Sequence, residues 1–420
     1  METPYFKGGR NRLWVKQQRA GLVDKRMVEA SHKYRFYPTS AQRTYLAHTF
    51  GCVRVVYNKA LEERERAYAE TGKGLSYNAT SALLTQWKRQ PEFAWLRDVS
   101  CVPLQQTLRD LGTAYQRFFK GQAKHPRFKS KNRKQSAEFT KSGFRLVTGS
   151  VAGRPQVYLP KQTQPLPIRW SRSLPSEPTT ITISKDQAER YFISFSIKID
   201  PPRFPKTGRS VGLDLGLTHA VITSDGQKID NPRYYRRSLG RLKREQKVLS
   251  RKQPGSNNRR KQRLKMARLH GRIADMRRDW CHQLTTDLVR RFDLIAIESL
   301  NVSGMVKNHN LAQAISDVSW GEIKRQLRYK TTWYGKQLVE IDQWTPTSKT
   351  CSACSHRLSA LPLSVREWVC PTCGAVHDRD VNAAVNVQAA GLAVGTDIGP
   401  LASGLNGRPV TALSVAGVSG

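Results

Sequence analysis

Two cysteine pairs with matched spacing constrain the fold of this 420-residue chain more than any other feature of its sequence. The pairs are "CSAC" at residues 351–354 and "CPTC" at residues 370–373, with fifteen residues between them. Four thiolates at this spacing are typical of a closed, tetrahedral zinc site in a small ribbon. The sequence therefore predicts structural Zn²⁺ bound by Cys351, Cys354, Cys370 and Cys373.

The remaining cysteines and the nearby histidines are not needed for this site. A redox role is the alternative for the two pairs, but their matched form favours a metal site in a reducing cytosol. His356 and His377 are surplus to a complete set of four thiolates. Cys52, Cys101 and Cys281 lie on apolar faces of expected helices, so we expect all three in the core.

Three carboxylates interrupt or end segments that otherwise have the character of buried structure. Asp214 lies in the expected strand "VGLDLGL", Glu298 ends "LIAIE", and Asp380 opens the expected helix that contains "VNAAVN". Acids buried together raise one another's pKa, because their negative charges repel and are poorly solvated. A divalent cation bound between them offsets that repulsion. Mg²⁺ takes oxygen ligands, and two such ions can support phosphodiester cleavage. The pattern predicts a magnesium site formed by these three acids.

Each acid also has a simpler interpretation when it is taken alone. Asp214 could pair with an arginine, Glu298 could face solvent at the end of a strand, and Asp380 could cap a helix. Asp378 competes with Asp380 for the third position, and the local sequence alone barely separates them. If Asp380 is the ligand, Asp378 becomes the expected N-cap.

The charge balance indicates the class of partner. Lys and Arg number 71 against 32 Asp and Glu, which gives a formal net charge of +39. A protein this basic repels itself unless a polyanion neutralises it, so a merely solvated basic surface is the weaker alternative. We expect nucleic acid as the partner, with binding that weakens as salt rises. No apolar run reaches the ~18–20 residues of a membrane span, so no membrane partner is expected.

Hydrophobic periodicity gives a coarse map of the chain. A short strand is expected at 32–38, and Thr39 or Ser40 would cap the first of several helices that follow up to about residue 125. Alternating residues within 179–199 predict a β-hairpin, and the proline-rich stretch 200–208 indicates a domain boundary. A basic helical hairpin is expected at 233–278.

Several of these motifs together resemble one known family. "GLDLG", "IAIESL", "SDVSWGEIKRQLRYKTTWYG", the two cysteine pairs and "HDRDVNAAVN" resemble the RuvC-type, ribonuclease-H-fold half of TnpB proteins. "YRFYPTSAQ", "VYNKALEERERAYAETGKGLSY" and "PRFKSK" extend the resemblance over roughly residues 30–390. TnpB proteins are transposon-encoded, RNA-guided DNA endonucleases and are ancestors of type V CRISPR effectors.

The resemblance implies an α+β multidomain fold: a helical recognition lobe inserted in a small wedge β-barrel, then a RuvC-like ribonuclease-H-fold nuclease with an inserted zinc ribbon. It assigns the segments as follows: the wedge at 31–205 with the lobe at about 40–125, the nuclease at 206–350, a target-nucleic-acid-binding zinc module at 351–376 and a nuclease helix at 377–392. The basic extension at 1–30 departs from the family pattern, and the tail at 393–420, rich in Gly, Ala, Ser and Val without periodicity, is expected to be disordered.

The resemblance also implies an activity and its site residues. Asp214, Glu298 and Asp380 match the three catalytic carboxylates, and "DVNAA" favours Asp380 over Asp378. A guide RNA would pair with one strand of double-stranded target DNA beside a short duplex motif, and the magnesium site would cut the DNA. We expect a monomer bound to one RNA in the prokaryotic cytosol or nucleoid.

Three other functions remain open at this point. The chain could be a miniature type V CRISPR effector with the same mechanism, or a non-cleaving regulator that binds nucleic acid through its zinc ribbon. A conventional transposase that joins strands itself is the third, and it would need no RNA. The intact set of three acids argues against a nuclease-dead relative that represses transcription.

Overall fold

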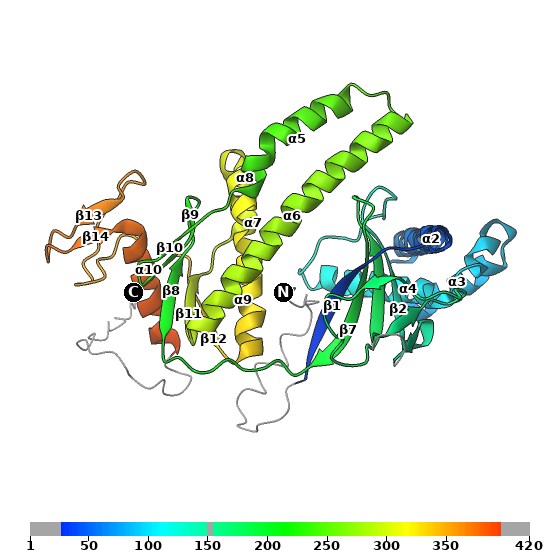
Figure 1. Cartoon of the computed structure of the whole chain (residues 1–420), viewed down its shortest axis with the longest axis horizontal. Helices are drawn as coiled ribbons and strands as arrows, with labels where there is room; N and C mark the ends of the chain where they lie inside the picture. Colours follow the sequence, from blue (N-terminus) through cyan, green and yellow to red (C-terminus); the bar gives the residue numbers. More distant parts are fainter. Residues whose placement is uncertain (1–26, 149–153, 396–420) are drawn as a thin grey trace. The chain divides into compact units, whose positions relative to one another are not determined.

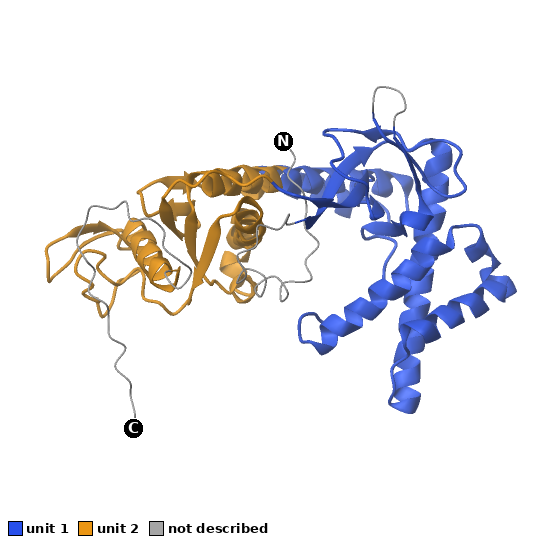
Figure 2. Cartoon of the chain, turned by 90° about the horizontal axis from the view of Figure 1, so that it is seen from below, with its two compact units in different colours: residues 1–201, 238–275 blue, residues 202–237, 276–420 orange. Residues whose placement is uncertain are grey.

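The computed structural model describes residues 27–148 and 154–395, and the chain divides into two compact units (Figure 2). One unit is Met1–Pro201 with Ser238–Asp275, and the other is Pro202–Arg237 with Met276–Gly420. Most of the expected N-terminal extension and most of the expected tail lie outside the described residues, and the last residues of that extension, from Val28, already belong to a strand. Within the two described ranges, every helix is too short or too polar to cross a bilayer.

The first unit contains an antiparallel sheet with the strand order β2-β6-β7-β1-β5 (Figure 1). Its strands are β1 Val28–Phe36, β2 Gln135–Thr140, β5 Ile168–Arg169, β6 Thr180–Lys185 and β7 Tyr191–Ile199. Alternate side chains of β7 are buried, including Ile193, Phe195 and Ile197, because successive residues of a strand point to opposite faces. The pairing of β6 with β7 confirms the hairpin predicted from this alternation.

The barrel predicted for this unit is not closed in the part of the chain that the structure describes. The outermost strands β2 and β5 do not pair with each other, and β5 has only two residues, which lie opposite Arg35 and Phe36. The strands β3 Arg145–Val147 and β4 Gln156–Tyr158 form a separate ribbon. A barrel needs unbroken pairing around the whole ring. The prediction of a closed wedge barrel was therefore wrong.

Helices fill the chain between β1 and β2, as the sequence predicted. They are α2 Ser40–Thr71, α3 Tyr77–Arg89 and α4 Cys101–Phe119, with the 3-10 turn η1 Pro91–Arg97 before α4. A second 3-10 turn, η2 Lys141–Gly143, follows β2. Thr39 is the N-cap of α2, and its side chain accepts a hydrogen bond from Gln42 N. Gln42 Oε1 accepts a hydrogen bond from the Thr39 N–H in return, which completes a capping box.

The single cysteines follow the core prediction with one exception. Cys52 in α2 and Cys281 are buried, as expected for small apolar side chains. Cys101 is exposed because it is the first residue of α4, where the side chain precedes the packed face of the helix. The prediction that Cys101 is a core residue was wrong.

The second unit is built on a mixed sheet with the strand order β10-β9-β8-β11-β12. Its strands are β8 Ser210–Asp214, β9 His219–Thr223, β10 Lys228–Asp230, β11 Leu294–Glu298 and β12 Gln337–Ile341. The three strands β8, β11 and β12 run parallel, whereas β8, β9 and β10 form an antiparallel meander. The carboxyl ends of the parallel strands therefore meet at one edge of the sheet.

Helices cover both faces of this sheet. The helices of the unit are the C-terminal part of α6 Asn257–Arg291, α7 Val302–Met305, α8 His309–Val318, α9 Trp320–Tyr334 and α10 Arg379–Gly395. Ile295 and Ile297 pack with Leu288 of α6 and with α9, whereas Leu294 and Ala296 pack with Val387 of α10. The continuous apolar run of β11 is explained by this burial on both faces.

Gly212 lets α10 lie directly on β8. A Cβ atom at this position would be 2.0 Å from the backbone oxygen of Ala384 and 2.4 Å from Gln388 N. Gln388 also donates a side-chain hydrogen bond to Ser210 O at 2.9 Å. The middle of α10 is thereby held against the strand that ends in Asp214.

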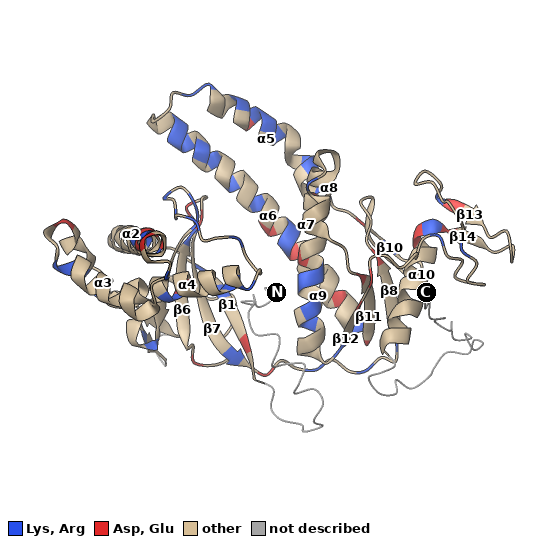
Figure 3. Ribbon diagram, turned by 180° about the vertical axis from the view of Figure 1, so that it is seen from behind, with Lys and Arg blue, Asp and Glu red and all other residues tan. Residues whose placement is uncertain are grey.

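The predicted basic hairpin consists of two helices, α5 Tyr234–Ser250 and the N-terminal part of α6. Figure 3 shows positions occupied by Lys and Arg, in blue, along both helices. Gln262 donates to Glu245 Oε2 at 2.7 Å, and Lys265 pairs with the same carboxylate at 2.8 Å. These contacts join the two helices although both carry mainly positive charge.

Candidate active site and four-cysteine cluster

Asp214 and Glu298 lie side by side at the carboxyl edge of the second sheet. Asp214 is the last residue of β8, and Glu298 is the last residue of β11. The two strands are parallel, and Leu213 is opposite Ile297 in their register. The next residue of each strand is an acid, so two residues 84 positions apart become neighbours. Parallel pairing explains how these two acids come to lie side by side.

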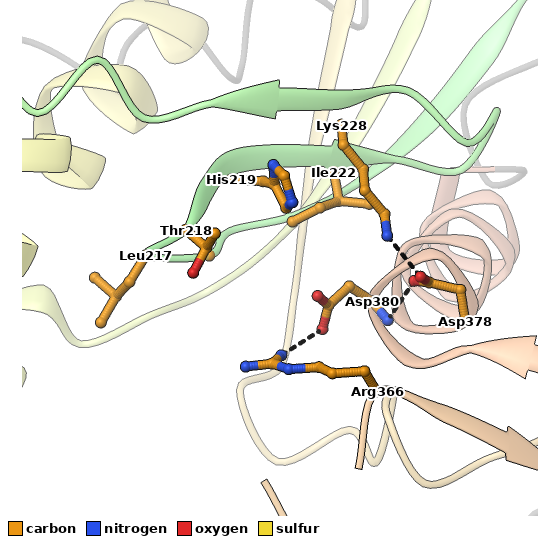
Figure 4. A pocket seen from close by; sticks show the side chains of 9 residues that line it. Leu217, Thr218, His219, Ile222, Lys228, Arg366, Asp378 and Asp380 are labelled. Atoms are coloured by element: carbon orange, nitrogen blue, oxygen red, sulfur yellow. Dashed lines mark hydrogen bonds and ion pairs between the residues drawn. The ribbon is translucent and has the colours of Figure 1, made fainter. Parts of the chain in front are cut away.

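Asp380 reaches the same edge from the first turn of α10. Asp378 occupies the N-cap position: its Oδ1 accepts hydrogen bonds from Asp380 N at 3.1 Å and Val381 N at 3.0 Å. Lys228 Nζ is 2.6 Å from the other oxygen of Asp378 (Figure 4). Asp378 is therefore occupied as a cap and ion-pair partner, as the sequence predicted if Asp380 is the ligand.

The pKa of Asp214 is raised by its surroundings. Burial is the largest cause and the negative charges of Glu298 and Asp380 add to it, so that the pKa is raised to about 7. The backbone N–H of Leu215 and the charge of Arg379 act in the opposite direction but do not cancel the rise. Asp214 thus holds a proton near neutral pH unless a cation offsets the three carboxylates.

The three carboxylates are more widely spread than the cysteines. The ligand atoms of the four cysteines all lie within 4.8 Å of one another. Among the described residues, the carboxylate oxygens of the three acids do not form so tight a group. Arg366 contacts Asp380 at 3.5 Å, and Thr347 contacts Glu298, so each side chain has another partner. The oxygen donors suit Mg²⁺, which would have to draw them together.

Sequence analysis missed the residues that hold Glu298. Thr347, in the segment between β12 and the first cysteine pair, donates a hydrogen bond from Oγ1 to Glu298 Oε1 at 2.7 Å. Asn386 Nδ2 donates to Thr347 O at 2.7 Å, and both Asn382 and Asn386 donate to Thr350 O. The spacing of the two asparagines, which places them on one helix face, was the signal for this anchor.

A hollow of about 390 Å³ borders Asp380 on one side. Its lining comes from the β8–β9 turn, β10, the ribbon and the start of α10: Gly216, Leu217, Thr218, His219, Ile222, Lys228, Arg366, Asp378 and Asp380 (Figure 4). His219 is paired with Asp230 at 2.8 Å. Cationic side chains thus adjoin the acid cluster on the side where a phosphate group could enter.

The four cysteines form a compact cluster in a small ribbon. Cys351 Sγ is 3.7 Å from Cys373 Sγ, and Cys354 Sγ is 3.6 Å from Cys370 Sγ. The strand β13 Glu367–Val369 leads into the second pair, and the strand β14 Val376–Asp378 connects that pair to α10. Trp368 of β13 packs against Cys351 and Cys370. Gly374 has a φ of 71°, which suits glycine at the turn after Cys373. The thiolate set fits a tetrahedral metal ion.

His377 lies closer to the cluster than expected. Its Nε2 is 3.0 Å from Cys351 Sγ, and its ring packs at 4.7 Å from Trp368. Because four sulfur atoms already complete a tetrahedral set, this contact makes His377 a hydrogen-bond partner of a thiolate.

Three family models match this chain. Residues 194–309 match OrfB_IS605, described as "Probable transposase", and residues 320–387 match "Cas12f1-like, TNB domain". Residues 27–73 match a model described as "Helix-turn-helix domain". In this structure the described part of that range contains β1 and the single helix α2, so it does not form a helix–turn–helix.

Two relatives cover most of the chain. A Streptomyces pristinaespiralis protein named "Putative RNA-guided DNA endonuclease" is 50% identical over 369 residues, which are 87% of this chain and 90% of that protein. The Escherichia coli K12 protein "Putative RNA-guided DNA endonuclease InsQ" is 32% identical over 86% of this chain and 92% of its own length.

One solved structure has the same overall fold. It is a chain of the "Cryo-EM structure of the Cas12f1-sgRNA-target DNA complex", with a TM-score of 0.53 and 12% sequence identity. The match covers 86% of this chain and 99% of that chain. The α+β character of the fold prediction is confirmed.

The fold and the two sites define an α+β protein that combines an acid cluster at a sheet edge with a four-cysteine ribbon. Within that class, the chain belongs to the OrfB_IS605 family, the TnpB family of transposon proteins. The family prediction made from the sequence motifs is confirmed.

Proposed function

We propose that this protein is an RNA-guided DNA endonuclease whose nuclease site consists of Asp214, Glu298 and Asp380. The names of its two long relatives support this activity. The observation that carries the site assignment is the meeting of three acids at one sheet edge, where burial and mutual repulsion raise the pKa of Asp214 to about 7. A RuvC-like ribonuclease H fold is the architecture we assign to the second unit.

The chain's own residues prepare this site for cations. Three carboxylates present hard oxygen donors, and Thr347 fixes the orientation of Glu298 by its hydrogen bond. Asp378 and Lys228 fix the start of α10, so that Asp380 is presented by a rigid first turn. When bound, two Mg²⁺ ions would activate water and stabilise the leaving oxygen of the phosphodiester.

The ribbon has a structural role in this proposal. Cys351, Cys354, Cys370 and Cys373 would hold one Zn²⁺, which has no open position for substrate when four thiolates surround it. β14 leads directly from the second cysteine pair into α10. Zinc binding would thereby fix the segment that delivers Asp380 to the sheet edge.

A guide RNA and double-stranded target DNA are the proposed partners. The net charge of +39 and the basic faces of α5 and α6 supply the attraction for phosphates (Figure 3). Pairing between guide and target would supply the sequence selection, while the first unit reads a short duplex motif. The proposed complex is one chain with one RNA, in the prokaryotic cytosol or nucleoid, and the segment roles are those implied by the family.

Guided cleavage by purified protein tests this function. The protein is co-expressed with RNA from the end of its transposon, and a DNA duplex that matches the guide is added with and without Mg²⁺. Asp214→Asn and Glu298→Gln should abolish cutting, whereas Asp287→Asn, an acid of α6 paired with Arg291, should leave it unchanged.

Three outcomes would contradict the proposal. Cutting that persists in Asp214→Asn or Glu298→Gln would remove the site assignment. Cutting or strand joining that is independent of RNA would favour a conventional transposase. A discrete bound RNA without any cutting would favour a non-cleaving regulator.

A further inference from the structure

Trp344 is exposed to an unusual degree for the largest apolar side chain. Its side chain is 80% exposed, whereas Trp87, Trp320 and Trp333 are each 5% exposed or less. Tryptophan carries a large apolar surface and is usually buried or placed at an interface. An indole left in solvent on a structured segment therefore points to a binding partner.

The turn that carries Trp344 is built by hydrogen bonds. Asp342 Oδ1 accepts from Trp344 N at 2.9 Å, and Asp342 O accepts from Thr345 N at 3.2 Å. Thr347 N then donates to Thr345 O at 2.8 Å. These bonds fix the backbone on both sides of the indole, so that its presentation to solvent is a property of the fold.

The same turn is joined to the acid cluster. It begins directly after β12, whose last residue Ile341 is opposite Glu298 in the parallel sheet. It ends at Thr347, whose hydroxyl donates to Glu298 and whose carbonyl accepts from Asn386 of α10. Three residues span at most ~11 Å, so Trp344 lies within about that distance of the residue that holds Glu298.

We propose that Trp344 stacks on an unpaired nucleobase of the strand that is cut, near the scissile phosphate. That the base lies near the cut follows from the short chain span between Trp344 and Thr347, the residue that holds Glu298. The inference rests on the proposed nuclease function for the identity of the strand. The stacking itself requires only that a single strand binds at this sheet edge.

The chemistry of the surroundings favours a nucleobase over an apolar peptide. Arg366 of the ribbon is two-thirds exposed and contacts Asp380, and Lys228 lines the same hollow. Phosphates would be drawn to these cations, while the neighbouring aromatic face would take a base. Stacking accepts every base, which suits an enzyme that selects its target by pairing.

Photocross-linking tests the contact without any cleavage. A single-stranded DNA 20-mer with one 5-iodouracil is irradiated with the full-length protein in the absence of added Mg²⁺, and the tryptic peptides are sequenced by mass spectrometry. The peptide of residues 337–349 contains Trp344 as its only aromatic residue. We expect adducts on this peptide in the wild type and in Trp344→Phe, and none in Trp344→Leu. Adducts confined to other peptides would overturn the inference.

Single-turnover cleavage with a guide-matched duplex then tests the consequence. Trp344→Leu should cut about 5- to 100-fold more slowly than the wild type, whereas Trp344→Phe should remain within about threefold, because phenylalanine keeps an aromatic face. Leu363→Ala is the matched control, since Leu363 is an equally exposed apolar residue of the ribbon, and it should cut at the wild-type rate.

An abasic scan locates the stacked base. One abasic nucleotide, placed near the cut, should slow the wild type but not slow Trp344→Leu any further. Equal rates for Trp344→Leu and the wild type would overturn the inference while leaving the nuclease proposal intact. A wild type that cuts nothing but cross-links through Trp344 would refute the nuclease proposal and retain the single-strand contact.

Discussion

Lys228 Nζ lies 2.6 Å from Asp378 Oδ2, and this ion pair connects β10 to the turn that starts α10. The other oxygen of Asp378 caps the helix, so both of its oxygens are engaged in holding the turn. Asp380 lies two residues later. Among the ion pairs of the described residues, its carboxylate takes part in one, with the exposed Arg366. The two aspartates of "HDRD" therefore have different roles, one in holding the helix and one in the acid cluster.

Matched asparagine substitutions separate these two aspartates. Asp378→Asn keeps a good N-cap and loses a half-exposed ion pair worth under about 1 kcal/mol, so guided cleavage should stay within about threefold of the wild type. Asp380→Asn should lower the cleavage rate about a hundredfold or more, because a charged metal ligand is lost. Rates are compared by single-turnover cleavage. The reverse order would assign the third acid to Asp378.

Thr347 should affect the reaction through Glu298. Thr347→Val keeps the side-chain shape but removes the hydroxyl that donates to Glu298, and we expect the cleavage rate to fall about 10- to 100-fold. Thr332→Val is the control, because Thr332 is an exposed residue of α9 whose hydroxyl bonds only to Arg328 O. Conservative Thr347→Ser should restore most of the rate. A full rate for Thr347→Val would show that Glu298 needs no such support.

The raised pKa of Asp214 predicts a pH-dependent cost to stability in protein without Mg²⁺. The folded state holds the Asp214 proton up to about pH 7, whereas the unfolded chain releases it near pH 4. Between these values the folded state binds more protons, so the free energy of unfolding falls as pH rises, by about 4 kcal/mol in total.

Asp214→Asn removes this cost because asparagine does not ionise. The melting temperature of the variant, measured without added Mg²⁺, should exceed that of the wild type at pH 8 and match it at pH 4. Asp287→Asn should show the same small difference at both pH values. An Asp214→Asn effect that does not change with pH would mean that the three acids do not interact as described.

Two glycine-to-alanine substitutions should have opposite effects on stability. In Gly212→Ala the new methyl group would overlap the backbone of α10, and we expect a loss of about 1–3 kcal/mol together with slower cleavage, because Asp380 is displaced. Gly240→Ala lies in α5 with no atom within 4 Å of the new Cβ, and it should gain about 0.5–1 kcal/mol. Chemical denaturation measures both changes.

Zinc content tests the four-cysteine cluster. The purified wild type should contain one zinc ion per chain, and Cys370→Ser should lose it and with it the fixed environment of Trp368. Cys101→Ser removes an exposed thiol outside the cluster and should retain one zinc. Metal is measured by elemental analysis. One zinc retained in Cys370→Ser would show that this thiolate is not a ligand.

Local patterns in the sequence predicted much of the secondary structure. The capping box at Thr39 and Gln42, the alternation from Ile193 to Ile197, and the cysteine spacing each depend on residues close together in the chain. Whether the first sheet closes into a barrel could not be predicted in this way. Whether β2 reaches β5 depends on sheet twist and on the length of connecting segments, which no local pattern records.

The sequence by itself determined the candidate chemistry of this protein: four thiolates at zinc spacing, three acids in apolar segments, and a charge that requires a polyanion. Only the tertiary structure decided which groups meet. The parallel pairing of β8 with β11 sets Asp214 beside Glu298, and the close packing of α10 on Gly212 brings Asp380 to them. The contact of Thr347 with Glu298 also arises from folding, because it joins residues from distant parts of the chain. The exposure of Trp344 is likewise visible only in the folded chain, since the sequence pattern does not record which apolar side chains stay in solvent.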